Sequence, residues 1–549
     1  MQGVVRVVVI VQLCEQYART SAITDVWVHG LDCADLRDRV LLTIRLPTTE
    51  DAWVVSAGKK KTLVNFLFFF TPQTIRNVYI RLCWYIYDFG TSVSATSYSD
   101  KLFKKMTLTS IHIVLSVAWQ DAGDTTRAIA MAKAMRDQCP PSLRLDIDFL
   151  SCGSRFEYQI TDAGFNIVPA QPRVQGISVA HDLGWDWPEF FGSEEIARSF
   201  IEGQIAAFQL LKPDIVFHGM WAPASIAARL LGIRTINFLP VPLHPSAFAH
   251  GLVRDLPDMM PVITRLPRRM RTTLAWWASG MMIKAPIFNQ RRLGAAAAGA
   301  GWPVKGPISL FDMNMADLNI VNDHPIFHQD YLHRLPENIV LTGPLYAGSD
   351  SELDADIAAH LERGPGPSIL VTMGSSGTED FLLEAVKALT LDPSDDWNAV
   401  VLASKSICSI EKVKEAVRGD ARLLVTDRFI PASAANALAD VIISHGGQGT
   451  VQCALAAGKP IVGVALQVEQ QTNLDNAMNF GAAIRIQKQA WKAKKIRQTV
   501  LTVLRDPEYK ANAKKLAETL NAMDGAKTAA EVMWEFILNE QTVEIPVKA

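Results

Sequence analysis

A glycine-rich turn between a buried strand and a helix constrains this chain more than any other feature. The turn is Ser444-His445-Gly446-Gly447-Gln448-Gly449-Thr450; it follows the apolar run Val441-Ile442-Ile443 and precedes apolar residues at helical spacing. A helix that begins at such a turn points unpaired N–H groups and the positive end of its dipole at one place. The stretch therefore predicts an anion site, and we expect the anion to be a diphosphate.

The same order of strand and then helix repeats along most of the chain. It begins with a strand at 111–115 and a helix at 125–136, and it starts again at 369–373. Alternation of this kind produces a parallel sheet with helices on both faces. We expect an α/β protein with two doubly wound, Rossmann-like domains that face each other across a cleft.

This order divides the chain into five segments. Residues 1–105 mix short apolar runs without a clear period, so they are interpreted as an N-terminal appendage or a stretch outside the true reading frame. The first Rossmann-like domain is expected over 106–345, a Gly- and Ser-rich linker over 346–358 and the second domain over 359–525. The last segment, 526–549, is expected to form a helix that packs back on the first domain.

Composition excludes several classes of protein. The 549 residues carry a formal net charge of −2, which leaves no general attraction to nucleic acid. Seven scattered cysteines without a C-x-x-C pair favour reduced thiols over a disulfide framework or a zinc site. Apolar runs are too short for a membrane span, and the N-terminal run contains Arg6 and lacks a clear cleavage site, so we expect a cytoplasmic protein.

The order and spacing of residues from Phe429 to Asn473 resemble the nucleotide-sugar signature of the UDP-glycosyltransferase family. The resemblance extends from about residue 111 to about residue 538 and is strongest in the C-terminal half. Its pieces are Phe429-Ile430-Pro431, Ala439-Asp440, His445-Gly446-Gly447-Gln448-Gly449-Thr450, Ala454-Leu455, Gly458-Lys459-Pro460, Glu469-Gln470, Asn473 and Ala477. The resemblance implies the two-domain GT-B fold and transfer of a sugar from a nucleotide.

The resemblance also implies a diphosphate site made of one imidazole and several backbone amides. Its members would be His445, Gly447, Gln448, Gly449 and Thr450, with Gly374 and Ser375 closing from the neighbouring turn. The residues themselves agree, since a helix N-terminus with an imidazole donor can carry the charge of a leaving diphosphate without a metal. We therefore expect no metal and no cofactor. The alternative for His445 is a satisfied loop histidine.

Glu469-Gln470 corresponds to the family's pair that binds sugar hydroxyls. Carboxylate and amide side chains suit this task because each can form two hydrogen bonds with neighbouring hydroxyls. The alternative is a polar loop after the strand at 461–464.

The nucleobase and ribose site departs from the family pattern. Phe429 and Ile430 stand where the family often places residues against the base, although Phe429 is equally well interpreted as a core aromatic. Cys453 stands where the family usually has a ribose-binding Glu. Because a thiol cannot hold two ribose hydroxyls, either Gln452 substitutes or the nucleotide is held differently.

Gly123-Asp124 resembles the Gly-Asp variant of the family's usual Gly-His pair, seen in sterol and glycopeptide glycosyltransferases. The resemblance implies that Asp124 is the catalytic base. A carboxylate is a weak base for an alcohol, so burial must strengthen it or deprotonation must be concerted with attack. The alternative is an Asp that caps the helix starting at Thr125. His218, at the end of a predicted strand, is the second candidate as base or relay.

Between Val253 and Trp302, within the first predicted domain, the aromatic pair Trp276-Trp277 follows four arginines, which are Arg265, Arg268, Arg269 and Arg271. One interpretation is a basic, aromatic face that contacts a bilayer or a lipophilic acceptor. Helices packed on the first domain with their arginines in solvent are favoured, so peripheral membrane contact is not expected. The Ala- and Gly-only run at 294–301 is expected to be a loose connection.

Together these features predict an inverting glycosyltransferase. It would move a hexose from a nucleoside diphosphate sugar, expected to be a UDP-sugar, to a hydroxyl of a small lipophilic acceptor such as a sterol, polyketide or phenolic. The alternatives are a nucleotide-sugar epimerase or phosphorylase on the same fold, or a non-catalytic protein that binds nucleotide sugars.

Overall fold

The computed structural model describes residues 26–27, 40–44, 53–57, 110–117, 122–177, 179–186, 188–256, 258, 260–345 and 352–539. The chain divides into two compact units, Met1–Thr107 and Leu108–Ala549. In the first unit, the described residues are β1 (Val26–Trp27), β2 (Val40–Ile44) and β3 (Trp53–Ala57), which pair antiparallel in the order β1-β2-β3. The rest of the predicted appendage, linker residues 346–351 and residues 540–549 lie outside the described residues.

The first half of the second unit contains a parallel sheet with the strand order β12-β11-β8-β7-β4-β5-β6. Its strands are β4 (Ser110–Leu115), β5 (Arg144–Ser151), β6 (Asn166–Pro169), β7 (Ile215–Phe217), β8 (Arg234–Leu239), β11 (Leu318–Val321) and β12 (Ile339–Leu341). Strands β7 and β11 are buried throughout, as expected for a sheet covered on both faces.

Helices connect these strands. They are α2 (Ala122–Asp137), α3 (Glu157–Asp162), α4 (Val179–Leu183), α5 (Glu194–Leu211), α6 (Ala222–Leu230), α7 (Pro245–His250), α8 (Arg268–Met282), α9 (Arg291–Gly299) and α10 (Leu310–Met313). A short antiparallel pair, β9 (Asn289–Gln290) with β10 (Ile308–Ser309), brackets α9. The prediction of a loose connection at 294–301 was wrong. The small residues instead let α9 pack closely, because a Cβ atom on Gly294 would collide with the backbone of Gly306.

The second half contains a parallel sheet with the order β15-β14-β13-β16-β17-β18. Its strands are β13 (Ser368–Thr372), β14 (Asn398–Leu402), β15 (Leu423–Thr426), β16 (Val441–Ser444), β17 (Ile461–Gly463) and β18 (Ala483–Arg485). Its helices are α11 (Ala355–Leu361), α12 (Glu379–Leu389), α13 (Ile410–Val417), α14 (Ala432–Leu438), α15 (Gln448–Ala456), α16 (Val468–Asn479), α17 (Ala493–Arg505) and α18 (Pro507–Asn521). The prediction of two doubly wound parallel sheets is confirmed.

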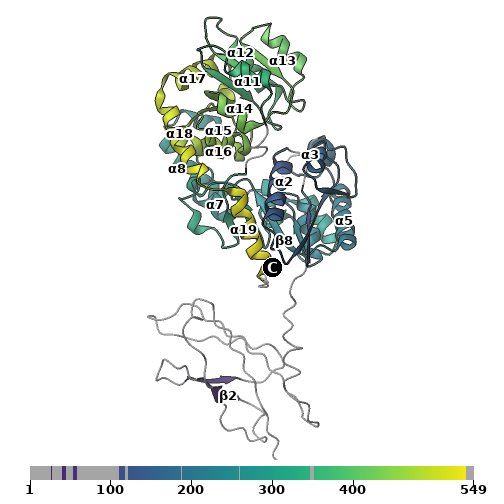
Figure 1. Ribbon diagram of the computed structural model, residues 1–549. Coiled ribbons are helices and arrows are strands. Elements are labelled where there is room, and N and C mark those ends of the chain that lie inside the picture. Colours follow the sequence, from purple (N-terminus) through teal and green to yellow (C-terminus); the bar gives the residue numbers. More distant parts are fainter. Residues whose placement is uncertain are drawn as a thin grey trace, which may run out of the picture. The chain divides into compact units, whose positions relative to one another are not determined.

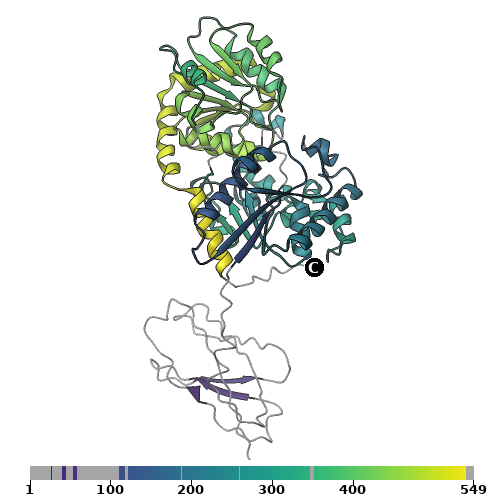
Figure 2. The same cartoon turned by 45° about the vertical axis from the view of Figure 1, so that its right-hand side comes forward.

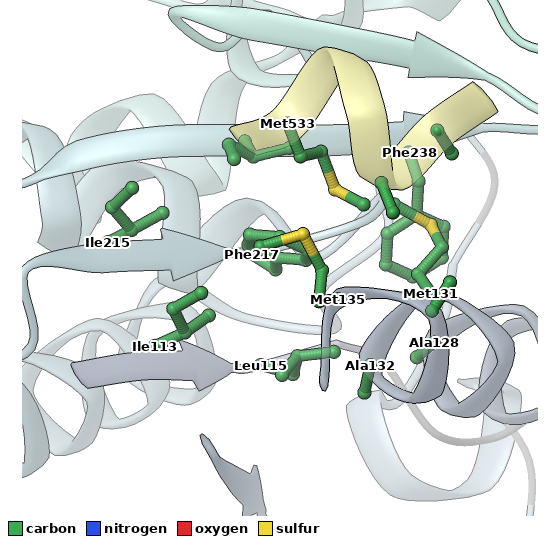
Figure 3. Packing of buried hydrophobic residues seen from close by; sticks show 14 of the residues in the cluster. Ile113, Leu115, Ala128, Met131, Ala132, Met135, Ile215, Phe217, Phe238 and Met533 are labelled. Carbon is green, nitrogen blue, oxygen red and sulfur yellow. The ribbon is translucent and has the colours of Figure 1, made fainter. Parts of the chain in front are cut away.

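The last helix, α19 (Gly525–Leu538), packs on the first half rather than the second (Figures 1 and 2). Figure 3 shows Met533 among Met135, Phe217 and Phe238, which come from α2, β7 and β8. The indole N–H of Trp534 donates to the carbonyl of Met135 at 3.1 Å. Helix α19 therefore completes the core of the first half. None of the helices in the described ranges is long and apolar enough to cross a membrane.

Met533→Ala should lower the free energy of unfolding by about 2–5 kcal/mol, because it leaves a cavity in a well-packed core. Denaturant unfolding followed by circular dichroism measures the change. The control is Glu535→Ala, which alters an exposed position on the same helix and should change stability by less than about 0.5 kcal/mol. Equal effects of the two substitutions would contradict the packing of α19.

Candidate active site

Each sheet has one place where the strand order reverses, and the predicted residues lie at both places. In the second sheet β13 and β16 are neighbours, and Gly374 follows β13 while His445 follows β16. In the first sheet β4 and β7 are the corresponding neighbours, and Asp124 follows β4 while His218 follows β7. In open α/β sheets, ligands bind in the crevice beyond the strand ends at such a reversal.

The imidazole of His445 is held between two glycines. A Cβ atom on Gly447 would lie 2.5 Å from His445 Nε2, and one on Gly374 would overlap the same ring at Cε1. Gly374 also has a φ angle of +57°, which side chains rarely adopt. The missing side chains of the two glycines therefore make room for the ring in its present orientation.

His445 is buried, and burial lowers the pKa of its imidazole to about 4. The ring is therefore neutral near pH 7. Its Nδ1 atom has no hydrogen-bond partner among the described residues. An unpaired polar atom at a buried position costs about 1–3 kcal/mol, and a ligand bound here can remove that cost.

The helix α15 starts directly after this turn. Gly447 is its N-cap, so the N-cap residue has no side chain to accept from the first-turn amides. The N–H of Gln448 donates to the carboxylate of Glu469. That contact places an acidic side chain at the positive end of the helix, where carboxylates and phosphates are favoured. The amides of Gly449 and Thr450 belong to the same first turn.

Glu469 and Gln470 lie in the first turn of α16, beside the turns after β13 and β16. Asn473 donates to Glu469 Oε1 at 2.6 Å and to the carbonyl of Gly446 at 3.1 Å. Gln470 donates to the hydroxyl of Ser376 at 3.3 Å and accepts from the N–H of Leu466. The structure therefore brings the predicted sugar-binding pair together with the turns predicted to bind diphosphate, which include Gly374 and Ser375.

The environment of Glu469 makes its carboxyl group unusually basic. Burial raises its pKa to about 7, while the hydrogen bond from Asn473 and the charge of Arg127 act in the opposite direction. The carboxyl group therefore changes its charge within the physiological range.

Arg127 connects the two halves at this point. Its Nη2 atom lies 2.5 Å from Asp124 Oδ1, and its Nη1 donates to Gln448 Oε1 at 3.2 Å. Asp124 lies inside the first turn of α2, which begins at Ala122, so the interpretation of Asp124 as a helix cap was wrong. Sequence reasoning missed Arg127, although its i, i+3 spacing from Asp124 places both side chains on one helix face.

His218 is fully buried, and its Nδ1 lies 2.7 Å from the carbonyl of Gly219. Desolvation lowers the pKa of its imidazole to about 3, and the charge of Arg229 acts in the same direction. Its Nε2 has no partner, and within the described ranges no hydrogen bond joins it to Asp124. Its role as a relay stays a prediction.

The residues predicted to bind the nucleobase and ribose do not all lie on one accessible surface. Phe429 is 71% exposed, so it is not a core aromatic, whereas Ile430 is buried in the core of the second half. The Gln452 amide donates to the carbonyl of Asn322 at 2.9 Å and to Asp323 Oδ1 at 3.1 Å. Cys453 is buried, and desolvation raises the pKa of its thiol to about 12. In this structure the Gln452 amide is thus already hydrogen-bonded to Asn322 and Asp323 of the first half.

Two doubly wound parallel sheets, one in each half, form the GT-B fold of glycosyltransferases. A family model described as erythromycin biosynthesis protein CIII-like, C-terminal domain, matches residues 390–536. Within the described residues, no group of three or more His, Cys, Asp or Glu side chains could hold a metal ion.

Relatives and solved structures agree with this fold. A glycosyltransferase of PGL/p-HBAD biosynthesis from Mycobacterium tuberculosis is 30% identical over 335 residues, which cover 60% of this chain and 72% of that protein. A rhamnosyltransferase of PGL/p-HBAD biosynthesis from Mycobacterium bovis is 24% identical over 58% of this chain and 67% of that protein. The calicheamicin glycosyltransferase CalG4 covers 79% of this chain and 100% of its own, with a TM-score of 0.54 and 14% identity. The chain belongs to the UDP-glycosyltransferase family, and it is a glycosyltransferase.

Gly447→Ala should weaken nucleoside diphosphate binding by about tenfold or more, because the new Cβ atom displaces the imidazole of His445. Isothermal titration calorimetry with UDP measures the loss. Gly449→Ala is the matched control for the fold, since a Cβ atom there meets nothing within 4 Å and should leave the free energy of unfolding unchanged or slightly higher. Wild-type affinity in the Gly447 variant would contradict the role of His445 in diphosphate binding.

The pKa of Glu469 predicts a pH dependence of sugar binding. Below about pH 7 its carboxyl group is protonated, and above it the carboxylate is a stronger acceptor for sugar hydroxyls. The affinity for UDP-glucose should therefore rise with pH through about 7 in the wild type, relative to Glu469→Gln, which cannot titrate. UDP-glucose suits this measurement because its diphosphate, unlike the terminal phosphate of UDP, does not titrate there. A fall in relative affinity would show that repulsion of the diphosphate dominates.

Proposed function

We propose that this glycosyltransferase moves a hexose from a UDP-sugar to a hydroxyl of a small lipophilic acceptor, with inversion at the anomeric carbon. The observation that carries the proposal is the contact chain from Asp124 through Arg127 to Gln448. It joins the predicted base in the first half to the predicted diphosphate turn in the second. A reaction that removes a proton on one side and releases a diphosphate on the other needs this juxtaposition.

In the proposed reaction, His445 and the first-turn amides of α15 hold the diphosphate. Glu469 and Gln470 orient the sugar, and Asp124 accepts the proton of the acceptor hydroxyl as its oxygen attacks the anomeric carbon. The bond from that carbon to the diphosphate oxygen breaks as the new glycosidic bond forms. The nucleoside diphosphate leaves with the bonding electrons.

Arg127 has a defined place in this scheme. Its guanidinium is bonded to Asp124 and Gln448, and its Nε atom has no hydrogen-bond partner within the described ranges. A cation at this position offsets negative charge that develops on the leaving diphosphate. The same charge keeps the Asp124 carboxylate oriented until the acceptor arrives. We therefore propose charge stabilisation by protein groups, with no metal and no cofactor besides the nucleotide sugar.

The donor and acceptor classes are proposed from one solved structure and from the names of the relatives. The rice protein Os79, which has the same fold with a TM-score of 0.55 and 15% identity over 77% of this chain and 100% of its own, has been solved in complex with UDP. The curated relatives are named as a rhamnosyltransferase and a glycosyltransferase of PGL/p-HBAD biosynthesis. We propose a uridine nucleotide and a lipophilic acceptor, and a donor screen with UDP- and dTDP-sugars distinguishes the two bases.

Asp124→Asn should lower kcat for sugar transfer by about a hundredfold or more, because the amide cannot accept the hydroxyl proton. UDP release with a panel of lipophilic acceptors measures kcat, and calorimetry with UDP should show an affinity close to that of the wild type. The control is Asp137→Asn at the exposed end of the same helix, which should keep full activity. Unchanged turnover in the Asp124 variant would remove this residue from the mechanism. Sugar isomerisation without an acceptor would contradict the proposed function itself.

A further inference from the structure

A patch of large apolar side chains is exposed on one part of the first half. It lies on the 3-10 helix η2 (Pro261–Arg265), on α8 and on the residue before η2. Val262 is 90% exposed, Trp277 67% and Trp276 55%. We call it the α8 face, and its apolar members are Met260, Val262, Met270, Trp276, Trp277 and Met281. Exposed apolar residues are ordinary when single, whereas these six are gathered within residues 260–281, on two consecutive elements and the residue before them, which favours an interaction site.

The orientation of α8 explains why these side chains remain outside. Ala275 and Ser279, one turn apart, are buried on the side that packs against α7. Met270, Trp277 and Met281 are spaced by seven and four residues, so they form a stripe along the exposed side. Helix α8 therefore buries small residues against the protein and exposes its largest apolar side chains to solvent.

The charge of this segment has a single sign. From residue 259 to residue 310 the sequence contains no Asp or Glu, although the whole chain has a formal net charge of −2. Arg265 and Arg269 are exposed, and neither forms an ion pair with any described residue. Arg271, in contrast, is used internally, since it pairs with Asp255 at 3.2 Å. Arg265 and Arg269 are thus two exposed cations without an ion pair in the described part of the chain, on the same two elements as the exposed apolar side chains.

We propose that the α8 face docks this protein on a bilayer that contains anionic headgroups. Tryptophan and methionine side chains enter the boundary between headgroups and acyl chains, while arginines attract anionic lipids. With 15 residues, α8 is shorter than the roughly 20 needed to span a bilayer, and its other side is packed on the protein. The helix therefore lies on the membrane.

Charge argues against a second copy of the chain as the occupant. A two-fold interface places the same patch of both subunits together. Arg265 and Arg269 of each copy would then face those of the other, with no acidic residue from this segment to pair with them. An anionic lipid surface supplies the missing charge. The proposal concerns the surface alone and does not depend on which donor or acceptor the enzyme uses.

Vesicle flotation of the full-length protein tests the proposal. The protein should float with vesicles of phosphatidylcholine and phosphatidylglycerol, bind vesicles of phosphatidylcholine alone about tenfold less, and dissociate at high salt. Trp276→Ser with Trp277→Ser should reduce binding by about tenfold or more, since each tryptophan removes a large apolar surface from the boundary region. Arg265→Glu with Arg269→Glu should reduce it on anionic vesicles to a similar degree.

Matched controls separate this face from general surface effects. Leu210→Ser alters an apolar side chain that is 80% exposed on α5, and Lys494→Glu with Lys495→Glu alters two exposed cations on α17. Both should bind vesicles like the wild type, and thermal melting should confirm that all variants fold. Absence of wild-type binding to anionic vesicles, or equal losses in the control variants, would overturn the proposal. Self-association in light scattering that disappears in the double tryptophan variant, without vesicle binding, would assign the face to a second copy.

Discussion

The reversal of strand order in each sheet is the constraint on which the site depends. In a doubly wound sheet, the chain leaves the two central strands toward opposite sides, so nothing covers the space beyond their carboxyl ends. β13 and β16 are these two strands in the second half, and β4 and β7 are these two strands in the first. The turn proposed to bind the diphosphate and Asp124 are at these places for a topological reason. Neither could be moved along its sheet without losing the access that the reversal provides.

Close packing at these strand ends holds the side chains of the candidate site in fixed positions. The ring of His445 occupies the room that Gly374 and Gly447 leave, so its unpaired Nδ1 is held in one direction. Asn473 fixes Glu469 in the same way from within α16. Preorganised donors of this kind cost no reorganisation when charge develops, which supports the proposed role of a neutral imidazole and backbone amides toward a leaving diphosphate.

Local motifs could be predicted from the sequence, and contacts between distant segments could not. The turn at 444–450 was found because strand, glycines and helix are contiguous, and both parallel sheets followed from hydrophobic periodicity. Arg127 was missed because its second partner, Gln448, lies 321 residues away in the chain. The same limit applies to Gln452, whose amide is bound by Asn322 and Asp323 of the first half. For α9, composition suggested flexibility, but small side chains here serve close helix packing.

Helix α16, which carries the proposed sugar-binding residues, contacts both halves of the enzyme. Arg485 of β18 pairs with Asp475 of α16 and with Asp255 of the first half, and all three side chains are buried. Gln471 and Thr472 donate to backbone carbonyls of Asp255 and Leu252.

Buried charges of this type cost much desolvation, and removing one partner leaves the others uncompensated, so the network favours a single arrangement of the two halves. Because Glu469 and Gln470 lie at the start of this helix, the first half fixes the position of the groups proposed to bind the donor sugar.

Helix α16 also forms a hydrogen bond through Asn479, its last residue, with Arg268 at the start of α8. The proposed membrane face and the proposed sugar site are therefore attached to opposite ends of one rigid element. Docking on a bilayer would thus orient the active site without requiring a conformational change.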